Sequence, residues 1–143
     1  VLLNMETLWQ QAYPSECVVV RPTGIYGTSV ARMIKLAETT KSYPKLHWSN
    51  RIHIDDLVAF LAHLLHVEHT EKSYICSNSQ PLPLHEIIQW FQQQLGLPVL
   101  VLESAVSSGK QIHATRMQQM NFELQHPHCF DDYLALLAER ESK

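Results

Sequence analysis

The sequence lacks long apolar runs and an excess of positive charge, and each absence excludes a class of protein. No uninterrupted apolar run in the 143 residues approaches the roughly 20 residues that a helix needs to cross a bilayer. The formal net charge is -3, so the chain has no broad positive field to attract nucleic acids or anionic lipids. We therefore expect neither a nucleic-acid partner nor a membrane partner.

Cysteine is also scarce. Cys17, Cys76 and Cys129 are odd in number, far apart and without a Cys-x-x-Cys pair, which argues against a disulfide framework and against a zinc site. The first residues carry neither the basic segment nor the long apolar run of a secretory signal, and they begin in mid-pattern like a segment of a longer chain. These features favour reduced thiols in a cytoplasmic protein.

Glycine is scarcer than a dinucleotide-binding turn would require. The four glycines are Gly24, Gly27, Gly96 and Gly109, and none stands in a Gly-x-x-Gly-x-x-Gly pattern. Such a turn lets a helix N-terminus receive the pyrophosphate of a dinucleotide. We therefore do not expect the chain to hold that part of a cofactor site.

What the sequence does contain is an alternation of strand and helix patterns. The β-branched run at 17–21 shows no polar alternation, which predicts a strand buried on both faces. Further strands are expected at 51–54, 73–76 and 99–102, and helices at 2–12, 30–38, 55–65, 84–95, 114–120 and 130–139. With 45% apolar residues, this pattern predicts one α/β domain.

Three segments in this order carry a resemblance to a known family. They are residues 18–27, which include Arg-Pro-Thr-Gly-Ile-Tyr-Gly, residues 50–58, which include Ile-His-Ile-Asp-Asp, and residues 110–127. Together they resemble the NAD-dependent epimerase/dehydratase group of extended short-chain dehydrogenases/reductases. The resemblance implies that residues 1–143 form a single C-terminal, substrate-side domain. Its fold would be the late strands and helices of a Rossmann-like sheet with a small substrate-binding lobe, and the N-terminal nucleotide-binding part would be absent.

The same resemblance implies roles for particular residues. The loop after the first strand would pass beside the nicotinamide and lead towards the substrate, as expected at the carboxyl end of a parallel strand. The residues bordering the cofactor would be Pro22, Thr23, Gly24 and Ile25, and those bordering the substrate would be Tyr26, Gly27, Arg32, His53 and Arg116. A turn that simply needs glycine, and ordinary surface charges, are the competing interpretations.

The catalytic pair of the family has no counterpart in this sequence. Tyr13 is followed four residues later by Cys17 and Tyr43 by His47, so neither forms a Tyr-x-x-x-Lys motif. We therefore assign no catalytic residue. The resemblance implies NAD or NADP and a nucleoside-diphosphate sugar as ligands of a complete parent protein, and we expect this chain alone to bind no cofactor and to be inactive. The alternative is a pseudoenzyme or interaction module that self-associates, for example as a homodimer through an exposed sheet edge.

Two other patterns have simpler structural explanations. Asp55 and Asp56 start a helix, where a carboxylate can cap free N–H groups, so capping is favoured over catalysis. Histidines recur at 63, 66 and 69 and again at 126 and 128, but no carboxylate or cysteine at matching helical spacing joins the first group. A solvated helix face explains that group, and no metal site is assigned.

Overall fold

The computed structural model describes residues 1–142 and confirms an α/β fold in which the expected elements occur in order, together with short strands that the sequence pattern did not predict. The helices are α1 (Leu2–Ala12), α2 (Ala31–Thr39), α3 (Ile54–Leu64), α4 (Leu84–Gln94), α5 (Thr115–Gln118) and α6 (Cys129–Glu141). The strands are β1 (Val19–Pro22), β2 (Gly24–Tyr26), β3 (Ser42–Tyr43), β4 (Leu46–Ser49), β5 (Arg51–His53), β6 (Ser73–Cys76), β7 (Leu82–Pro83), β8 (Val101–Leu102) and β9 (Ser107–Ser108).

The strands form several small sheets. β1 pairs in parallel with β6, and β2 pairs in parallel with β5, so the chain segment that joins β1 to β2 lies at the carboxyl ends of two parallel strands. β3 pairs in parallel with β8, while β4 lies between β7 and β9. The topology therefore presents residues 22–24 at the end of the β1–β6 sheet where ligands bind in open α/β folds.

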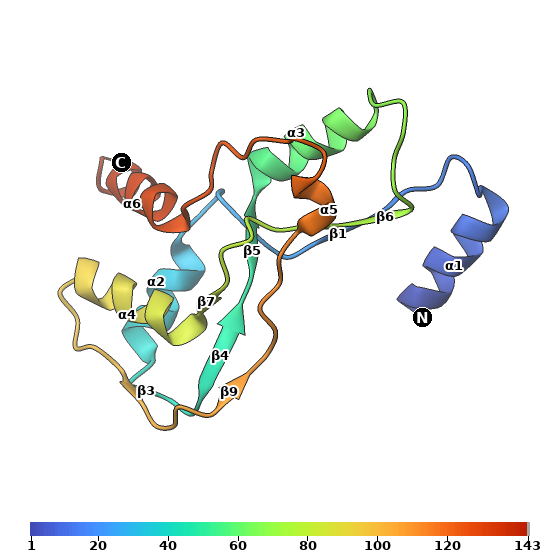
Figure 1. The fold of residues 1–143 in the computed structure, drawn as a ribbon. Helices are drawn as coiled ribbons and strands as arrows, with labels where there is room; N and C mark the ends of the chain where they lie inside the picture. Colours follow the sequence, from blue (N-terminus) through green and yellow to red (C-terminus); the bar gives the residue numbers. More distant parts are fainter. Residues whose placement is uncertain (143) are drawn as a thin grey trace.

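Two apolar clusters hold the fold together. One joins α2, α4 and α6 through residues such as Ile34, Phe91 and Tyr133. The other packs Phe60 of α3 and Met117 of α5 against one face of the β1–β6 pair. Figure 1 shows the three helices of the first cluster on one side of the molecule, with α3 and α5 over the sheet. β2 and β5 lie between the two clusters, so they carry their side chains to the junction.

The strand predicted at 17–21 differs from expectation in its burial. Its residues Cys17 to Val20 are half-buried and Arg21 is exposed, because α3 and α5 cover only one face of the sheet among residues 1–142. β6 shows the same asymmetry, with Tyr74 and Cys76 buried and Ile75 exposed. The strand predicted at 99–102 also shortens to Val101–Leu102. An apolar run identifies a strand but does not reveal which layers cover it.

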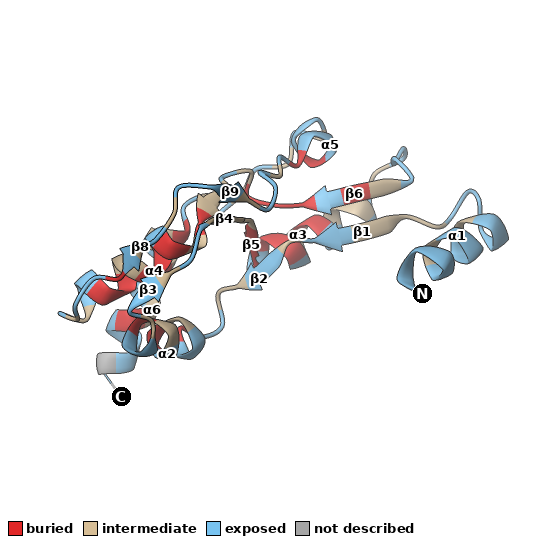
Figure 2. Ribbon diagram, turned by 90° about the horizontal axis from the view of Figure 1, so that it is seen from below, coloured by how far each residue is buried: buried red, intermediate tan, exposed pale blue. Residues whose placement is uncertain are grey.

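Helix α1 stands apart from the rest of the molecule. None of its residues is buried, although Leu3, Leu8 and Trp9 are large and apolar (Figures 1 and 2). Its contacts with the body include the ion pair between Glu6 and Arg21 and a hydrogen bond of 3.0 Å from Gln10 Nε2 to the Lys72 carbonyl. The helix predicted at 2–12 is thus confirmed, but its apolar stripe faces solvent. Within residues 1–142, no helix has the length and apolar character that crossing a membrane requires.

The start of α3 corrects the capping role expected for Asp55 and Asp56. His53 occupies the N-cap, and its Nδ1 accepts a hydrogen bond of 3.2 Å from the Asp55 N–H. The buried Asp56 carboxylate instead accepts hydrogen bonds from the backbone N–H groups of Gln125 at 2.8 Å and His126 at 3.0 Å. Asp56 therefore fastens the segment before α6 to the sheet lobe.

Replacing Asp56 with Ala should destabilise the chain by roughly 2–3 kcal/mol, because two N–H groups lose a charged acceptor in a buried setting. Urea unfolding monitored by circular dichroism measures the difference. Asp55→Ala is the matched control, since its side chain is 70% exposed and it should cost well under 1 kcal/mol. Equal losses in the two variants would contradict the role assigned to Asp56.

Candidate functional site

The loop expected to border the cofactor lines a cavity at the carboxyl end of β1. Thr23 is held there because its N–H and its hydroxyl both donate to the Cys76 carbonyl, at 2.9 and 3.0 Å. The Gly24 N–H donates to the Asn50 carbonyl at 3.0 Å. The cavity has a volume of about 400 Å³ and is lined by Arg21, Pro22, Thr23, Gly24, Asn50, Ile75 and Ile112.

A second cavity, of about 250 Å³, shares the lining residues Gly24 and Asn50 with the first. Its walls come from β2, α2, β5 and α6 and include Ile25, Tyr26 and Arg32. The structure thus brings three of the four cofactor candidates to the first cavity. Tyr26 and Arg32, two of the five substrate candidates, line the second cavity, and Gly24 lines both cavities.

Tyr26 is fixed by a short hydrogen bond to helix α6. Its hydroxyl donates to Asp132 Oδ2 at 2.6 Å, and its ring packs at 5.2 Å from that of Tyr133. Burial, followed by the hydrogen bond and charge of Asp132, raises the pKa of Tyr26 above its ordinary value. The phenol is therefore neutral at physiological pH and acts as a hydrogen-bond donor to the carboxylate.

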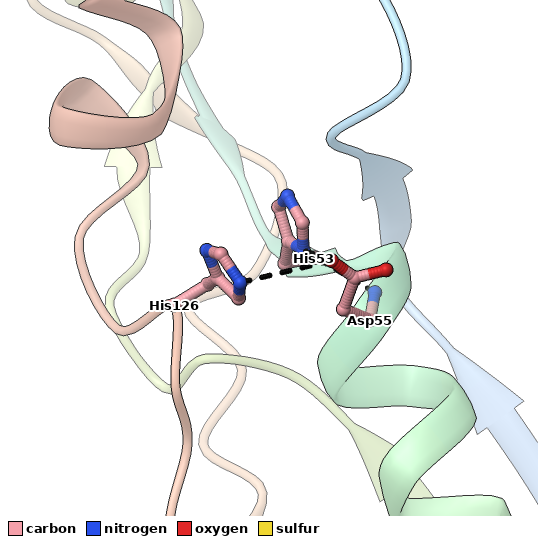
Figure 3. Close-up of side chains that lie close together, drawn as sticks. All are labelled: His53, Asp55 and His126. Carbon is pink, nitrogen blue, oxygen red and sulfur yellow. Dashed lines mark hydrogen bonds and ion pairs between the residues drawn. The ribbon is translucent and has the colours of Figure 1, made fainter. Parts of the chain in front are cut away.

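The second oxygen of Asp132 extends this contact to a pair of stacked histidines. His126 Nδ1 lies 2.6 Å from Asp132 Oδ1, and the His126 ring stacks on His53 at 3.7 Å with 15° between the planes. Asp55 Oδ2 lies 3.8 Å from His126 Nε2 and 3.7 Å from His53 Nδ1 (Figure 3). The hydrogen bond to Asp132, with smaller contributions from the charges of Asp132, Asp56 and Asp55, raises the pKa of His126.

His53, Asp55 and His126 place three ligand atoms within 4.8 Å of one another, which is close enough to consider a metal ion. Their geometry is that of a packed pair. The lone pair of each imidazole lies in its ring plane, and two nearly parallel planes cannot both point at an ion about 2 Å away. His53 Nδ1 also already accepts the Asp55 N–H. A metal would require one ring to turn, so we assign no metal to this cluster.

Gly27 is placed against the same histidine. It has φ 113°, and a Cβ at this position would lie 2.2 Å from His53 Nε2. His53 is buried, with 6% of its surface exposed, and it packs between Tyr26 and His126. Gly27 and His53, two of the five residues expected to border the substrate, therefore form the wall behind Tyr26.

The two arginines expected near the substrate lie in different places. Arg32 is exposed on α2 and lines the 250 Å³ cavity. Arg116 donates to the carbonyl and the hydroxyl of Ser73 at 2.9 and 3.0 Å, at the amino end of β6. Tyr26 and His53 lie on the neighbouring β2–β5 pair, which follows the carboxyl end of β1. Arg116 is thus not brought together with the other substrate candidates.

Several site residues were not identified from the sequence. Asp132 belongs to no recognised motif, while Arg51 and His126 lie in the matched segments 50–58 and 110–127 but were given no role at the site. Asn50 lies in the matched segment 50–58 and lines both cavities. Its side-chain amide donates to the Lys110 carbonyl and accepts from the Ile112 N–H, both at 2.8 Å. Only the tertiary fold reveals these partners.

No protein-family profile matches the sequence, and no curated protein matches it significantly. Among solved structures, a protein described as an NAD-dependent epimerase/dehydratase from Methylobacillus flagellatus is 32% identical. That match covers 97% of this chain and 52% of the other, with a TM-score of 0.83. The dTDP-glucose 4,6-dehydratase of Bacillus anthracis, solved in complex with NAD, is 16% identical over 96% of this chain and 49% of its own, with a TM-score of 0.69.

The ADP-L-glycero-D-manno-heptose-6-epimerase of Helicobacter pylori is 14% identical over 85% of this chain and 43% of its own, with a TM-score of 0.59. The chain therefore spans about half the length of the structures that it matches. These similarities confirm the resemblance expected from residues 18–27, 50–58 and 110–127, and they confirm the partial Rossmann-like fold.

Gly27→Ala should destabilise the chain by roughly 3 kcal/mol or more, because left-handed backbone strain adds to the overlap with the immobile His53 ring. Gly96→Ala is the matched control. Gly96 has φ 64°, but no atom lies within 4 Å of the place that its Cβ would take, so the cost there should be the backbone strain alone. That strain is worth about 1–2 kcal/mol. Thermal or urea unfolding gives both values, and equal losses would show that the His53 contact contributes nothing.

Asp132→Asn should lower the pKa of His126 towards its ordinary value of about 6.5. With Asp132 present, the raised folded-state pKa stabilises the chain fully below pH about 6.5 and this contribution is lost as pH rises through the folded value. NMR titration of the imidazole and urea unfolding between pH about 5 and 9 measure both effects. Asp131→Asn, exposed on the same helix, should leave the titration unchanged. An unaltered His126 titration in Asp132→Asn would refute the assignment.

Proposed function

We propose that this chain, which resembles the NAD-dependent epimerase/dehydratase group over nearly all its length, supplies the substrate-side half of an active site. The parent activity would be that of an NAD(P)-dependent nucleoside-diphosphate-sugar epimerase or dehydratase. The observation that carries the proposal is the 32% identity with the Methylobacillus flagellatus protein over 97% of this chain. The proposal treats residues 1–143 as one C-terminal domain in a cytoplasmic protein.

In this proposal the two cavities have separate roles. Pro22, Thr23, Gly24 and Ile25 border the nicotinamide, and the exposed backbone of Gly24 allows a ring to approach without a side chain in between. Tyr26 and Arg32 face the substrate, while Gly27 and His53 support Tyr26 from behind. Arg116 is kept as a proposed substrate contact only for a ligand long enough to reach the cavity of about 310 Å³ that it lines with Arg21.

The residues that this chain contributes can position ligands. Tyr26 is a neutral donor already engaged by Asp132, so it is not free to exchange a proton with a substrate. NAD or NADP would supply the hydride chemistry in the parent. The tyrosine and lysine that the family uses for proton exchange would come from outside these residues, so the chain alone should be inactive.

A second candidate is a self-associating module without catalytic activity. It is favoured by the exposed apolar residues of α1, which include Leu2, Leu3 and Trp9, and by Ile75 on the open face of the β1–β6 sheet. Contiguous exposed apolar patches often mark interaction sites. A stable homodimer in size-exclusion chromatography with mass detection would support this candidate, whereas a monomer that aggregates would support the first.

The fragment hypothesis is tested by a chimera. The chain is fused behind the part of the Methylobacillus flagellatus protein that it does not cover, and NADH binding is followed by fluorescence. The chimera should bind NADH, and the isolated chain should neither bind it nor convert nucleoside-diphosphate sugars. Tight NADH binding and turnover by the isolated chain would contradict the proposal.

Within the chimera, Thr23→Trp should weaken NADH binding about tenfold or more, because an indole would fill the cavity beside Gly24. Thr39→Trp, on the exposed end of α2, is the matched control and should bind like the parent chimera. If both variants bind NADH normally, the loop at 22–25 does not border the cofactor.

A further inference from the structure

The half-buried imidazole of His126 meets a carboxylate at each of its two nitrogens. Nδ1 lies 2.6 Å from Asp132 Oδ1, and Nε2 lies 3.8 Å from Asp55 Oδ2 (Figure 3). The backbone N–H of His126 donates to Asp56 at 3.0 Å, and the His53 ring stacks on the imidazole at 3.7 Å. The titratable groups with a described contact to His126, from α3, α6, β2 and β5, are Asp55, Asp56, Asp132, Tyr26 and His53.

Only the protonated ring of His126 suits both of these contacts. An imidazolium carries an N–H on each nitrogen, whereas a neutral imidazole carries one N–H and one lone pair. Whichever neutral tautomer formed, it would turn a lone pair towards either Asp132 or Asp55. The raised pKa of His126, which results first from the hydrogen bond to Asp132 and then from the charges of the three aspartates, agrees with this geometry.

Loss of this proton acts on helix α6. Asp132 provides the hydrogen bonds that join α6 to Tyr26 of β2 and to His126 in the preceding segment. Without the imidazolium, the carboxylates of Asp132, Asp55 and Asp56 lose the cation that lies among them, and like charges then repel. The other face of α6 packs on α2 and α4 through side chains such as Tyr133. Single elements of this kind can open locally at a lower free energy than the whole domain.

We propose that His126 is a pH switch: its protonated ring holds α6 against β2 and α3, and loss of the proton lets α6 open as a unit while the β1–β6 sheet stays folded. Opening removes Tyr133 from the wall of the 250 Å³ cavity and releases the Tyr26 hydroxyl from Asp132. Access to that cavity therefore increases with pH. The switch does not rest on the proposed function, because it involves only groups of this chain.

Native-state hydrogen exchange of the chain between pH about 6 and 9, corrected for intrinsic exchange rates and measured with EDTA present, tests the switch. The closed state holds one proton that the open state releases, so protection of the α6 amides should fall by up to about tenfold per pH unit above pH about 6.5. It should level off at the His126 pKa that NMR titration gives for the same chain. Protection that is independent of pH, or that levels off elsewhere, would overturn the proposal.

His126→Gln removes the titration but keeps a side-chain amide that can donate to Asp132. Protection of α6 in this variant should be low at pH about 6 and should not change up to pH about 9. His128→Gln is the matched control, because His128 is exposed and hydrogen-bonds to Gln80 Oε1, so the wild-type pH dependence should persist. A pH dependence that survives in His126→Gln would contradict the switch. If that variant does not fold, the agreement between the wild-type exchange profile and the NMR titration decides.

Cysteine labelling separates the opening of α6 from unfolding of the whole chain. Cys129 begins α6 and Cys76 ends β6, and both thiols are buried. Each is alkylated with iodoacetamide, and its rate is divided by its rate in the urea-unfolded chain at the same pH. At pH about 8.5, Cys129 should react at least about tenfold faster than Cys76 on this scale, because it is exposed by local opening. Equal values would show that only global unfolding exposes Cys129 and would refute the switch.

Discussion

The carboxylate of Asp132 is the contact on which the geometry of the site depends. One oxygen accepts a hydrogen bond from the Tyr26 hydroxyl and the other is hydrogen-bonded to His126 Nδ1. Helix α6 is therefore joined to β2 and to the segment that precedes α6. His126 then stacks on His53, whose ring occupies the space left by the missing side chain of Gly27. Asp56 of α3 accepts hydrogen bonds from the backbone of residues 125 and 126, just before α6. These contacts fix the cluster of α2, α4 and α6 relative to α3 and the β1–β6 sheet.

Polar side chains are buried at the junction of the two apolar clusters, whereas apolar side chains are exposed elsewhere, and the two features have different causes. The charges of Asp132 and Asp56 are satisfied by short hydrogen bonds, which makes their burial tolerable. The apolar stripe of α1 and the outer face of β1 and β6 have no such cover among residues 1–142. Parallel sheets usually carry helices on both faces, so the uncovered face of β1 and β6 is the face on which further helices would pack.

Sequence patterns located most elements but few of the contacts that build the site. Helical periodicity placed α1, α3 and α4 to within about two residues, and Gly96 and Asn121 adopt the positive φ that is common just after a helix. The Arg-Pro-Thr-Gly-Ile-Tyr-Gly segment identified the loop that borders both cavities. Capping by Asp55 or Asp56 was wrong, since His53 caps α3. Asp132 and Arg51 act through partners 106 and 78 positions away, and no local pattern encodes such pairs.

Ligands are expected to meet this chain at the carboxyl end of β1 and the amino end of β5, around Gly24 and Arg51, and the proposed role in an active site requires this. Backbone NMR of the residues of this chain within the chimera, titrated with NADH and with UDP, tests it most directly. We predict that amide shift changes concentrate at residues 22–29, 32 and 49–51. Changes confined to Ser73 and residues 113–116, at the amino end of the sheet, would contradict it.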